Sequence, residues 1–120
     1  DPRSSALAIH RDIGRLTGLH VPVIIVDTQG RPWRLGAVGV AVGVAGMKPF
    51  VSYAGESDLV GNPLRGSMVC LADELAAASG LIMGQADEAV PAAIVRGIRY
   101  EKPEDDTERI AREDSENLFL

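Results

Sequence analysis

The sequence predicts an α+β fold with a mixed or antiparallel sheet and two main helices. Helical and strand patterns follow one another as helix, several strands, helix and strand, without the regular alternation of a doubly wound fold. The 120 residues fit one domain, and 46% of them are hydrophobic. Because only 4% are aromatic, small aliphatic side chains must fill the core.

The first expected elements are a helix and a buried strand. The helix begins at a cap of Ser4 or Ser5 and stops at Gly18. Its apolar stripe consists of Ile9, Ile13 and Leu16. Residues 21–26 form a short run rich in β-branched side chains, which favours a strand buried on both faces. Residues 27–32 then interrupt that strand with turn-forming chemistry.

A second strand is expected over residues 35–44, where valine alternates with glycine or alanine. One face of this strand is bulky and the other is nearly bare, so we expect another backbone or a ligand to approach it closely. Its glycine spacing matches neither the dinucleotide fingerprint nor a P-loop. A short strand over residues 50–53 and a loop over residues 55–66 are expected next.

The second main helix is expected to start at a cap by Ser67 and to run at least to Ser79. Gly80 and Gly84 are alternative stops for this helix. A last strand is expected over residues 91–95, because proline there is followed by small and β-branched residues.

Charge separates a neutral body from an acidic C-terminal segment. Residues 1–100 carry nine basic and nine acidic side chains, whereas residues 101–120 carry three basic and eight acidic ones, which gives the net charge of −5. This distribution argues against nucleic acid as a partner, because phosphate contacts need a clustered basic face. The apolar ending, residues 118–120, is a candidate to dock on the body.

Neither a membrane span nor an internal disulfide is expected. The longest uncharged run, residues 35–47, is too short to cross a bilayer as a helix. A single cysteine, Cys70, is typical of a reducing, cytoplasmic setting. The chain opens with Asp1 and no methionine, which favours part of a larger or split protein.

Two short stretches carry groups that suit phosphate chemistry. Asp27 and Thr28 place a carboxylate beside a hydroxyl, which suits Mg²⁺ or Mn²⁺ held together with phosphate oxygens. The alternative is that both residues only shape a turn. Arg31 and Arg34 offer guanidinium groups that can grip phosphate or carboxylate, or they are a solvated pair.

Other polar residues are assigned lesser roles. Residues 83–87 follow the second helix and either line a nucleotide pocket or simply end the helix. Asp73 and Glu74 are adjacent on a helix and do not share a face, so a surface role is expected. Three soft ligands lack zinc spacing and are expected to be structural: His10, His20 and Cys70.

The run from Val26 to Arg34 resembles the pattern S-D-T-x-G-R-P-W-R of the coenzyme F-420 γ-glutamyl ligases. Further blocks follow in that family's order: residues 40–46, 53–58 with 61–62, 72–78, 90–97 and 117–119. The chain departs from the family pattern at Val26, at Gln29 and over residues 37–39. The last of these departures replaces a more polar stretch and bears on the acceptor pocket.

The resemblance implies a ligase that uses GTP to add L-glutamate, through an acyl phosphate and a γ-glutamyl amide bond, to the F-420 precursor. It implies Mg²⁺ or Mn²⁺ as a cofactor, with K⁺ as a further candidate, and an intertwined homodimer in the cytoplasm without a membrane. Residues 1–100 would be the C-terminal half of the ligase domain and residues 101–120 an acidic segment of it. The chain would then need the N-terminal half, which supplies another metal-binding aspartate.

The resemblance also assigns site residues by position. The implied metal ligands are Asp27, Thr28 and Gln85. The implied nucleotide contacts are Met83, Gly84, Gln85 and Ala86, within the segment 83–90. Arg31 and Arg34 are assigned to catalysis on the physical argument given above. Two alternatives stay open: a non-catalytic dimerising fragment, and a related ligase with a different carboxylate acceptor.

Overall fold

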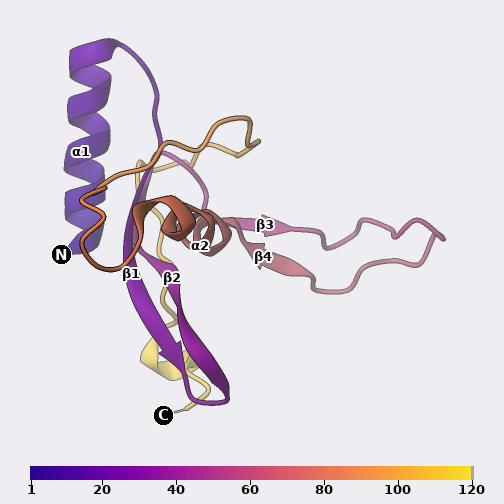
Figure 1. Ribbon diagram of the computed structural model, residues 1–120. Coiled ribbons are helices and arrows are strands. Elements are labelled where there is room, and N and C mark those ends of the chain that lie inside the picture. The colour runs from indigo at the N-terminus through magenta and orange to yellow at the C-terminus, as the bar shows by residue number, and fades with distance from the viewer. Residues whose placement is uncertain (120) are drawn as a thin grey trace.

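The computed structural model describes residues 1–119 and consists of two main helices and two antiparallel strand pairs (Figure 1). This arrangement confirms the predicted α+β class. The elements in order are α1 (Pro2–Thr17), β1 (Val23–Arg31), β2 (Arg34–Ala45), β3 (Phe50–Ser52), β4 (Met68–Cys70), α2 (Leu71–Met83) and a short 3-10 helix, η1 (Asp114–Glu116). In the described residues, neither main helix combines the length and apolar character that a membrane span requires.

Helix α1 begins earlier than predicted. Asp1 caps it, and not Ser4 or Ser5, because its carboxylate accepts hydrogen bonds from the amides of Arg3 (3.0 Å) and Ser4 (3.2 Å). The helix ends where predicted, at Gly18, which takes the left-handed conformation with φ of 72°.

Strands β1 and β2 form one long hairpin on which the two main helices pack (Figure 1). The predicted turn over residues 27–32 is wrong in extent. β1 continues through these residues to Arg31, which pairs with Arg34, so that only Pro32 and Trp33 turn the chain. Pairing with β2 overrides the local turn preference, because strand formation depends more on neighbours than on intrinsic propensity.

The glycines of β2 lie against two helices, one on each face of the hairpin, so the expectation of a single bare face is wrong. Val42 is an extra residue in the ladder, and this bulge puts Gly39 and Gly43 on opposite faces of the hairpin. A Cβ on Gly39 would lie 3.0 Å from the carbonyl oxygen of Ala76 in α2, and one on Gly43 would lie 2.9 Å from the amide nitrogen of Arg3 in α1. The predicted close approach of another backbone is therefore confirmed.

The core lies between the hairpin and α2 and is built mainly from small side chains, as the composition predicted. Its buried members are Ala41, Val44, Met47, Ala72 and Ala76. Helix α1 adds the buried residues Ala6 and His10. His10 Nδ1 donates to the carbonyl of Val21 (2.7 Å), and the His10 ring meets the His20 ring edge to face. These contacts agree with the structural role expected for both histidines.

Helix α2 begins later than predicted. Residues 68–70 pair with β3 as strand β4, so Ser67 does not cap the helix. The helix starts at Leu71 and ends at Met83, before Gly84, the second of the two predicted stops. A local cap signal was therefore overridden by the strand partner that β3 offers.

The predicted strand over residues 91–95 is absent. This stretch has no ladder partner, and Ile94 is 78% exposed. Its apolar residues look like a strand in the sequence, but a strand also needs a free edge to pair with. The predicted docking of residues 118–120 is wrong for Leu118 and Phe119, which are exposed, and Leu120 lies outside the described residues.

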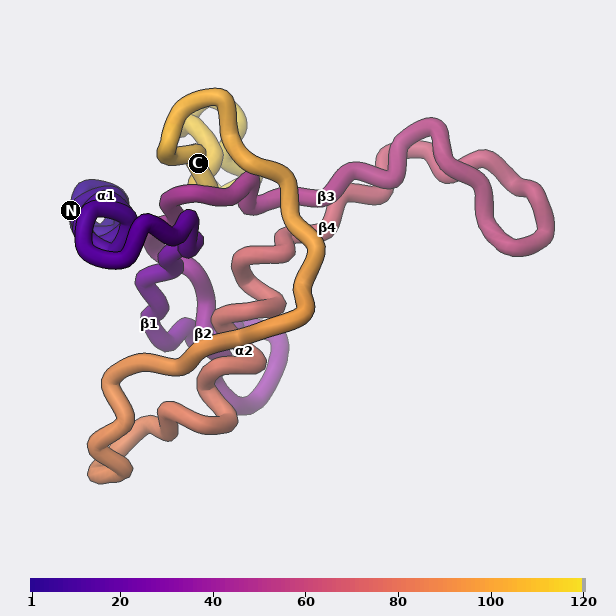
Figure 2. The backbone as a smooth tube through the Cα atoms, turned by 90° about the horizontal axis from the view of Figure 1, so that it is seen from above, coloured from indigo at the N-terminus to yellow at the C-terminus, as the bar shows by residue number. Residues whose placement is uncertain are grey.

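Residues 53–67 connect β3 to β4 as a hairpin arm that projects far from the body (Figures 1 and 2). The predicted loop over residues 55–66 lies within this arm. Asp58 ties its tip together, because the carboxylate accepts hydrogen bonds from the amides of Val60 (2.9 Å) and Asn62 (2.8 Å) and from Asn62 Nδ2 (3.0 Å).

The order of the arm tip is expected to depend on pH through Asp58. Hydrogen bonds from the Asn62 side chain, then from its backbone, hold the pKa of this carboxyl below its ordinary value. Because the pKa of Asp58 is lower in the folded than in the unfolded state, its ionised carboxyl stabilises the tip at pH values above the unfolded-state pKa. This stabilisation is lost as the pH falls through the folded-state pKa. NMR order parameters of residues 58–62 should stay constant down to about pH 4 and fall only below it. Loss of order well above pH 4 would contradict this assignment, and Asp58→Asn should abolish the transition.

Candidate functional site

A cavity of about 270 Å³ lies between the β1–β2 hairpin and the last turns of α2. Figure 1 shows α2 beside this hairpin. The residues that line the cavity are Val26, Asp27, Thr28, Gly39, Ala76, Gly80, Met83, Gly84 and Gln85. Several of them are glycine or alanine. These small residues let the backbones of β2 and α2 approach each other, and the cavity remains open beside that contact.

The cavity brings together five of the predicted site residues. The Thr28 hydroxyl donates a hydrogen bond of 2.7 Å to Gln85 Oε1, although the two residues are 57 positions apart. Asp27 lies beside them, and its Oδ1 accepts a hydrogen bond of 2.7 Å from the Thr28 amide. Met83 and Gly84 complete the same wall. The hydroxyl of Thr28 and the amide oxygen of Gln85 therefore meet at the cavity, and the neighbouring Asp27 lines it as well.

Local structure explains this convergence. β1 leaves the core after Val26, so that Asp27 and Thr28 are exposed while still held in the ladder opposite Val40 and Gly39. On the other side, α2 stops at Gly84, whose positive φ of 72° turns the chain back toward β1. A residue with a Cβ adopts that conformation only with strain, which is why glycine occupies the turn.

The oxygen donors fit a hard divalent cation that arrives with its own ligands. Mg²⁺ and Mn²⁺ accept carboxylate, hydroxyl and carbonyl oxygens and take their remaining ligands from water and phosphate. Among residues 1–119, no cluster of three or more His, Cys, Asp or Glu side chains is arranged to hold a metal. The residues of the cavity that could contribute oxygen ligands to such a cation are Asp27, Thr28 and Gln85.

The two predicted arginines lie away from this cavity, at the end of the hairpin. Arg31 Nη2 donates to the carbonyl of Gly36 (3.3 Å), and its Nε is buried without a hydrogen-bond partner in the described chain. Arg34 is exposed beside it. Arg31 follows Asp27 by four positions along β1, which is about 13 Å at 3.3 Å per residue. Neither arginine lines the cavity, and Ala86 does not line it either.

Asp73 has a structural role that the sequence analysis missed. It was expected on the surface, but it is partly buried, and its Oδ1 accepts a hydrogen bond of 2.9 Å from the Ala41 amide. Ala41 pairs with Val26, the residue before Asp27, and lies next to the bulge. Acidic residues are common in the first turn of any helix, so Asp73 carries no separate sequence signal for this contact.

Glu88 was also given no role of its own. Its Oε2 accepts a hydrogen bond of 2.8 Å from the Ala86 amide, within the loop that carries Gln85. Hydrogen bonds from the amide of Ala86 first, and also from those of Glu88 itself and Gln85, lower the pKa of this carboxyl. The one feature of the sequence that could have indicated this contact is an acidic residue four positions after the glycine that ends the helix.

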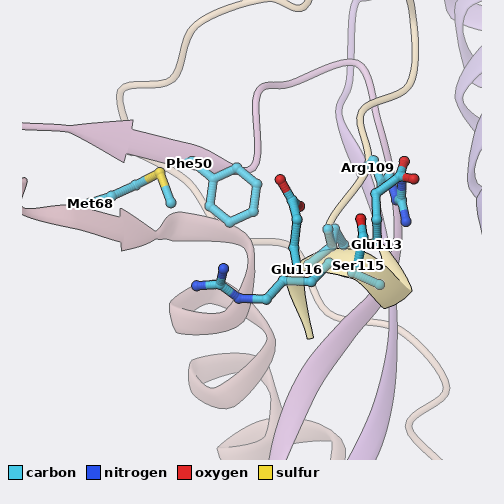
Figure 3. A pocket seen from close by; sticks show the side chains of 9 residues that line it. Phe50, Met68, Arg109, Glu113, Ser115 and Glu116 are labelled. Carbon is cyan, nitrogen blue, oxygen red and sulfur yellow. The ribbon is translucent and has the colours of Figure 1, made fainter. Parts of the chain in front are cut away.

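A larger hollow of about 650 Å³ lies between the base of the arm and the C-terminal segment. Figure 3 shows Phe50 and Met68 on the strand side and Arg109, Glu113 and Glu116 on the other. None of the predicted site residues lines this hollow, and Arg109 already forms an ion pair with Glu113. We therefore place the candidate site in the smaller cavity, where the chemistry converges.

The fold and the cavity together define an α+β domain with a cavity between a β hairpin and the end of a helix, and three residues of its lining have oxygen-bearing side chains. The family model described as F420-0:Gamma-glutamyl ligase matches residues 1–97. The chain therefore belongs to this family, as its sequence blocks predicted. The matched range includes every residue assigned to the site from the sequence.

Several relatives carry the name Coenzyme F420:L-glutamate ligase. The protein of Methanothermobacter thermautotrophicus is 59% identical over 97 residues, which is 81% of this chain and 38% of that protein. The protein of Methanopyrus kandleri is 48% identical over 101 residues, which is 84% of this chain and 40% of that protein. The protein of Archaeoglobus fulgidus is 42% identical over 119 residues, which is 99% of this chain and 47% of that protein. The chain thus spans less than half the length of these relatives.

Proposed function

We propose that this chain forms part of a ligase that joins L-glutamate by an amide bond to the precursor of coenzyme F-420. The observation that carries this proposal is the convergence of Asp27, Thr28 and Gln85 at one cavity in a member of this family. Relatives that share 59% and 48% of the aligned residues bear the name of that ligase.

GTP is the proposed co-substrate, since a carboxylate must be activated before an amine can attack it. The γ-phosphoryl group passes from GTP to a carboxylate oxygen of the acceptor, which gives an acyl phosphate and GDP. The amine of L-glutamate then attacks the acyl carbon, inorganic phosphate leaves with the bonding electrons, and the amine proton goes to solvent. Catalysis of phosphoryl transfer consists mainly of positioning and charge stabilisation.

The residues of the cavity are suited to such positioning. Asp27, Thr28 and Gln85 would hold Mg²⁺ or Mn²⁺, with K⁺ as a further candidate, and the cation would neutralise phosphate charge. Met83, Gly84 and Ala86 would contact the nucleotide from the end of α2. Arg31 and Arg34 would bind a phosphate or carboxylate group that reaches the end of the hairpin, because an arginine fork matches either anion.

The proposed active assembly is larger than this chain. Because the chain spans 38 to 47% of the three relatives compared above, we propose that the remaining part of the ligase supplies further nucleotide and metal contacts. We also propose that the complete enzyme is a cytoplasmic homodimer.

The test combines this chain with the part of the ligase that the matched region leaves out, as one polypeptide or by co-expression. With the F-420 precursor, L-glutamate, GTP and Mn²⁺, mass spectrometry should detect one added glutamyl unit and an equal amount of GDP. The matched control replaces GTP with ATP. Glutamylation at an undiminished rate without GTP would exclude the proposed co-substrate, and no glutamylation of any acceptor would exclude the ligase.

One observation favours a different acceptor as the second candidate. The stretch 37–39 departs from the family pattern, and Gly39 from this stretch lines the cavity. A ligase of the same mechanism would then activate another carboxylate. The test offers the enzyme a panel of carboxylates beside the F-420 precursor. Faster GTP-dependent glutamylation of the precursor would support the first candidate, and faster glutamylation of another carboxylate would support the second.

A further inference from the structure

Gln85 contributes an oxygen to the cavity from a position that no regular element holds. It follows the last residue of α2 by two positions and lies in an irregular stretch that is largely exposed. Its side chain still accepts a hydrogen bond from Thr28 on the opposite wall. A glutamine side chain on an unrestrained loop would sample many positions and rotamers. Another contact must therefore hold the backbone of this loop in place.

Glu88 provides that contact. Its carboxylate folds back over the loop and accepts the Ala86 amide at 2.8 Å. The carboxyl group also packs directly on Gly84, because a Cβ added at Gly84 would collide with it. The two contacts lie on either side of Gln85 in the chain, so that one side chain clamps both ends of the three-residue segment 84–86.

The backbone around this clamp is unusual. Gly84 combines φ of 72° with ψ of −167°, and Ala89 has φ of 56°, which makes it the one non-glycine residue with positive φ in the described chain. A non-glycine residue is uncommon there and needs surrounding contacts that hold it in place. The hydrogen bond from the Ala86 amide to Glu88 and the packing of the Glu88 carboxyl on Gly84 are contacts of this kind.

We propose that Glu88 is a positioning residue, whose carboxylate holds the 84–88 loop so that the Gln85 side-chain oxygen meets Thr28 at the cavity. Glu88 does not line the cavity itself. The inference rests on the proposed function in one respect, which is that Gln85 serves as a cation ligand. Groups that orient a metal ligand typically change metal affinity about 10- to 100-fold when they are removed.

The first part of the test uses single variants of the complete ligase, in which Mn²⁺ binding in the presence of GTP is followed by electron paramagnetic resonance. Glu88→Ala should weaken Mn²⁺ binding about 10- to 100-fold. Glu88→Gln should recover more than half of this loss on a logarithmic scale, because its amide oxygen can still accept the Ala86 amide. Glu104→Ala, at an exposed glutamate outside the cavity, is the matched control and should bind as the parent does. A loss in Glu88→Gln as large as in Glu88→Ala would overturn the proposal, since the charge itself would then act on the cation.

The second part is a double-mutant cycle with Gln85→Ala. If Glu88 acts through Gln85, Glu88→Ala should have no further effect on Mn²⁺ affinity once Gln85 is replaced. Fully additive losses would overturn the proposal.

Hydrogen exchange at the Ala86 amide separates this inference from the proposed function. Glu88→Ala should remove the protection of that amide whether or not a cation binds. Unchanged protection would overturn the positioning role even if the ligase is active. If Gln85→Ala binds Mn²⁺ normally while the Ala86 amide loses protection in Glu88→Ala, the clamp stands and the metal role of Gln85 fails.

Discussion

Asp27→Ala is expected to weaken the binding of Mn²⁺ in the presence of GTP by at least about a hundredfold. Removal of a group that only orients a ligand already costs about 10- to 100-fold in affinity, and among residues 1–119 Asp27 is the one carboxylate-bearing residue that lines the cavity. Ligase turnover in the complete enzyme should fall by at least as much, because the cation must neutralise charge as the phosphoryl group moves. Mn²⁺ titration and single-turnover formation of GDP measure the two effects.

A matched control removes one carboxylate elsewhere. Asp105→Ala changes the net charge equally at an exposed position of the C-terminal segment, outside the cavity. It should leave both Mn²⁺ affinity and turnover unchanged, because an exposed charge that does not line the cavity is screened by salt. Equal losses in the two variants would mean that net charge, and not the Asp27 carboxylate, governs cation binding. Full activity of Asp27→Ala would remove the metal assignment.

Gly43→Ala is expected to destabilise the fold by about 1 to 3 kcal/mol, the usual cost of inserting a methyl group into a packed contact. The new Cβ would lie 2.9 Å from the Arg3 amide nitrogen and even closer to the backbone of Pro2. These are backbone atoms, so no side-chain rotation can relieve the overlap, and α1 must shift or lose its first turn. Thermal unfolding should show a decrease of several degrees in Tm.

Gly30→Ala is the matched control for this effect. Gly30 lies in the same hairpin, and a Cβ there would meet no atom within 4 Å. Its unfolding free energy should stay within about 0.5 kcal/mol of the parent value. Hydrogen exchange should show faster exchange in the first turns of α1 for Gly43→Ala only. Equal stability of the two variants would contradict the packing of α1 on β2.

The sequence predicted elements well where one local signal acted alone. The alternation of valine and glycine over residues 35–44 predicted both a strand and the close approach of another backbone. Gly18 ends α1 as expected, since few other residues adopt the left-handed conformation there. Predictions failed where a partner decided the outcome. The turn residues after Val26 became strand because β2 pairs with them, and residues 91–95 stayed irregular because they have no ladder partner.

For the site, the residue types were readable but their distances were not. Asp27 and Thr28 could be proposed from a carboxylate next to a hydroxyl, and Gln85 followed only from the family pattern. The arginines were grouped with Asp27 because they are close in sequence, although an extended strand separates them by about 13 Å. Glu88 and Asp73 were missed because their hydrogen bonds to Ala86 and Ala41 depend on how the chain folds back.

The amino-acid sequence by itself therefore determined the family, the fold class and the candidate oxygen donors of this protein. These follow from composition, periodicity and residue order, which are properties of the chain alone. Only the tertiary structure decided which donors meet, because the Thr28 hydroxyl and the Gln85 oxygen are 57 residues apart and come within 2.7 Å only when α2 packs across the hairpin. That packing depends on backbone contact at Gly39, where α2 lies too close for a larger residue.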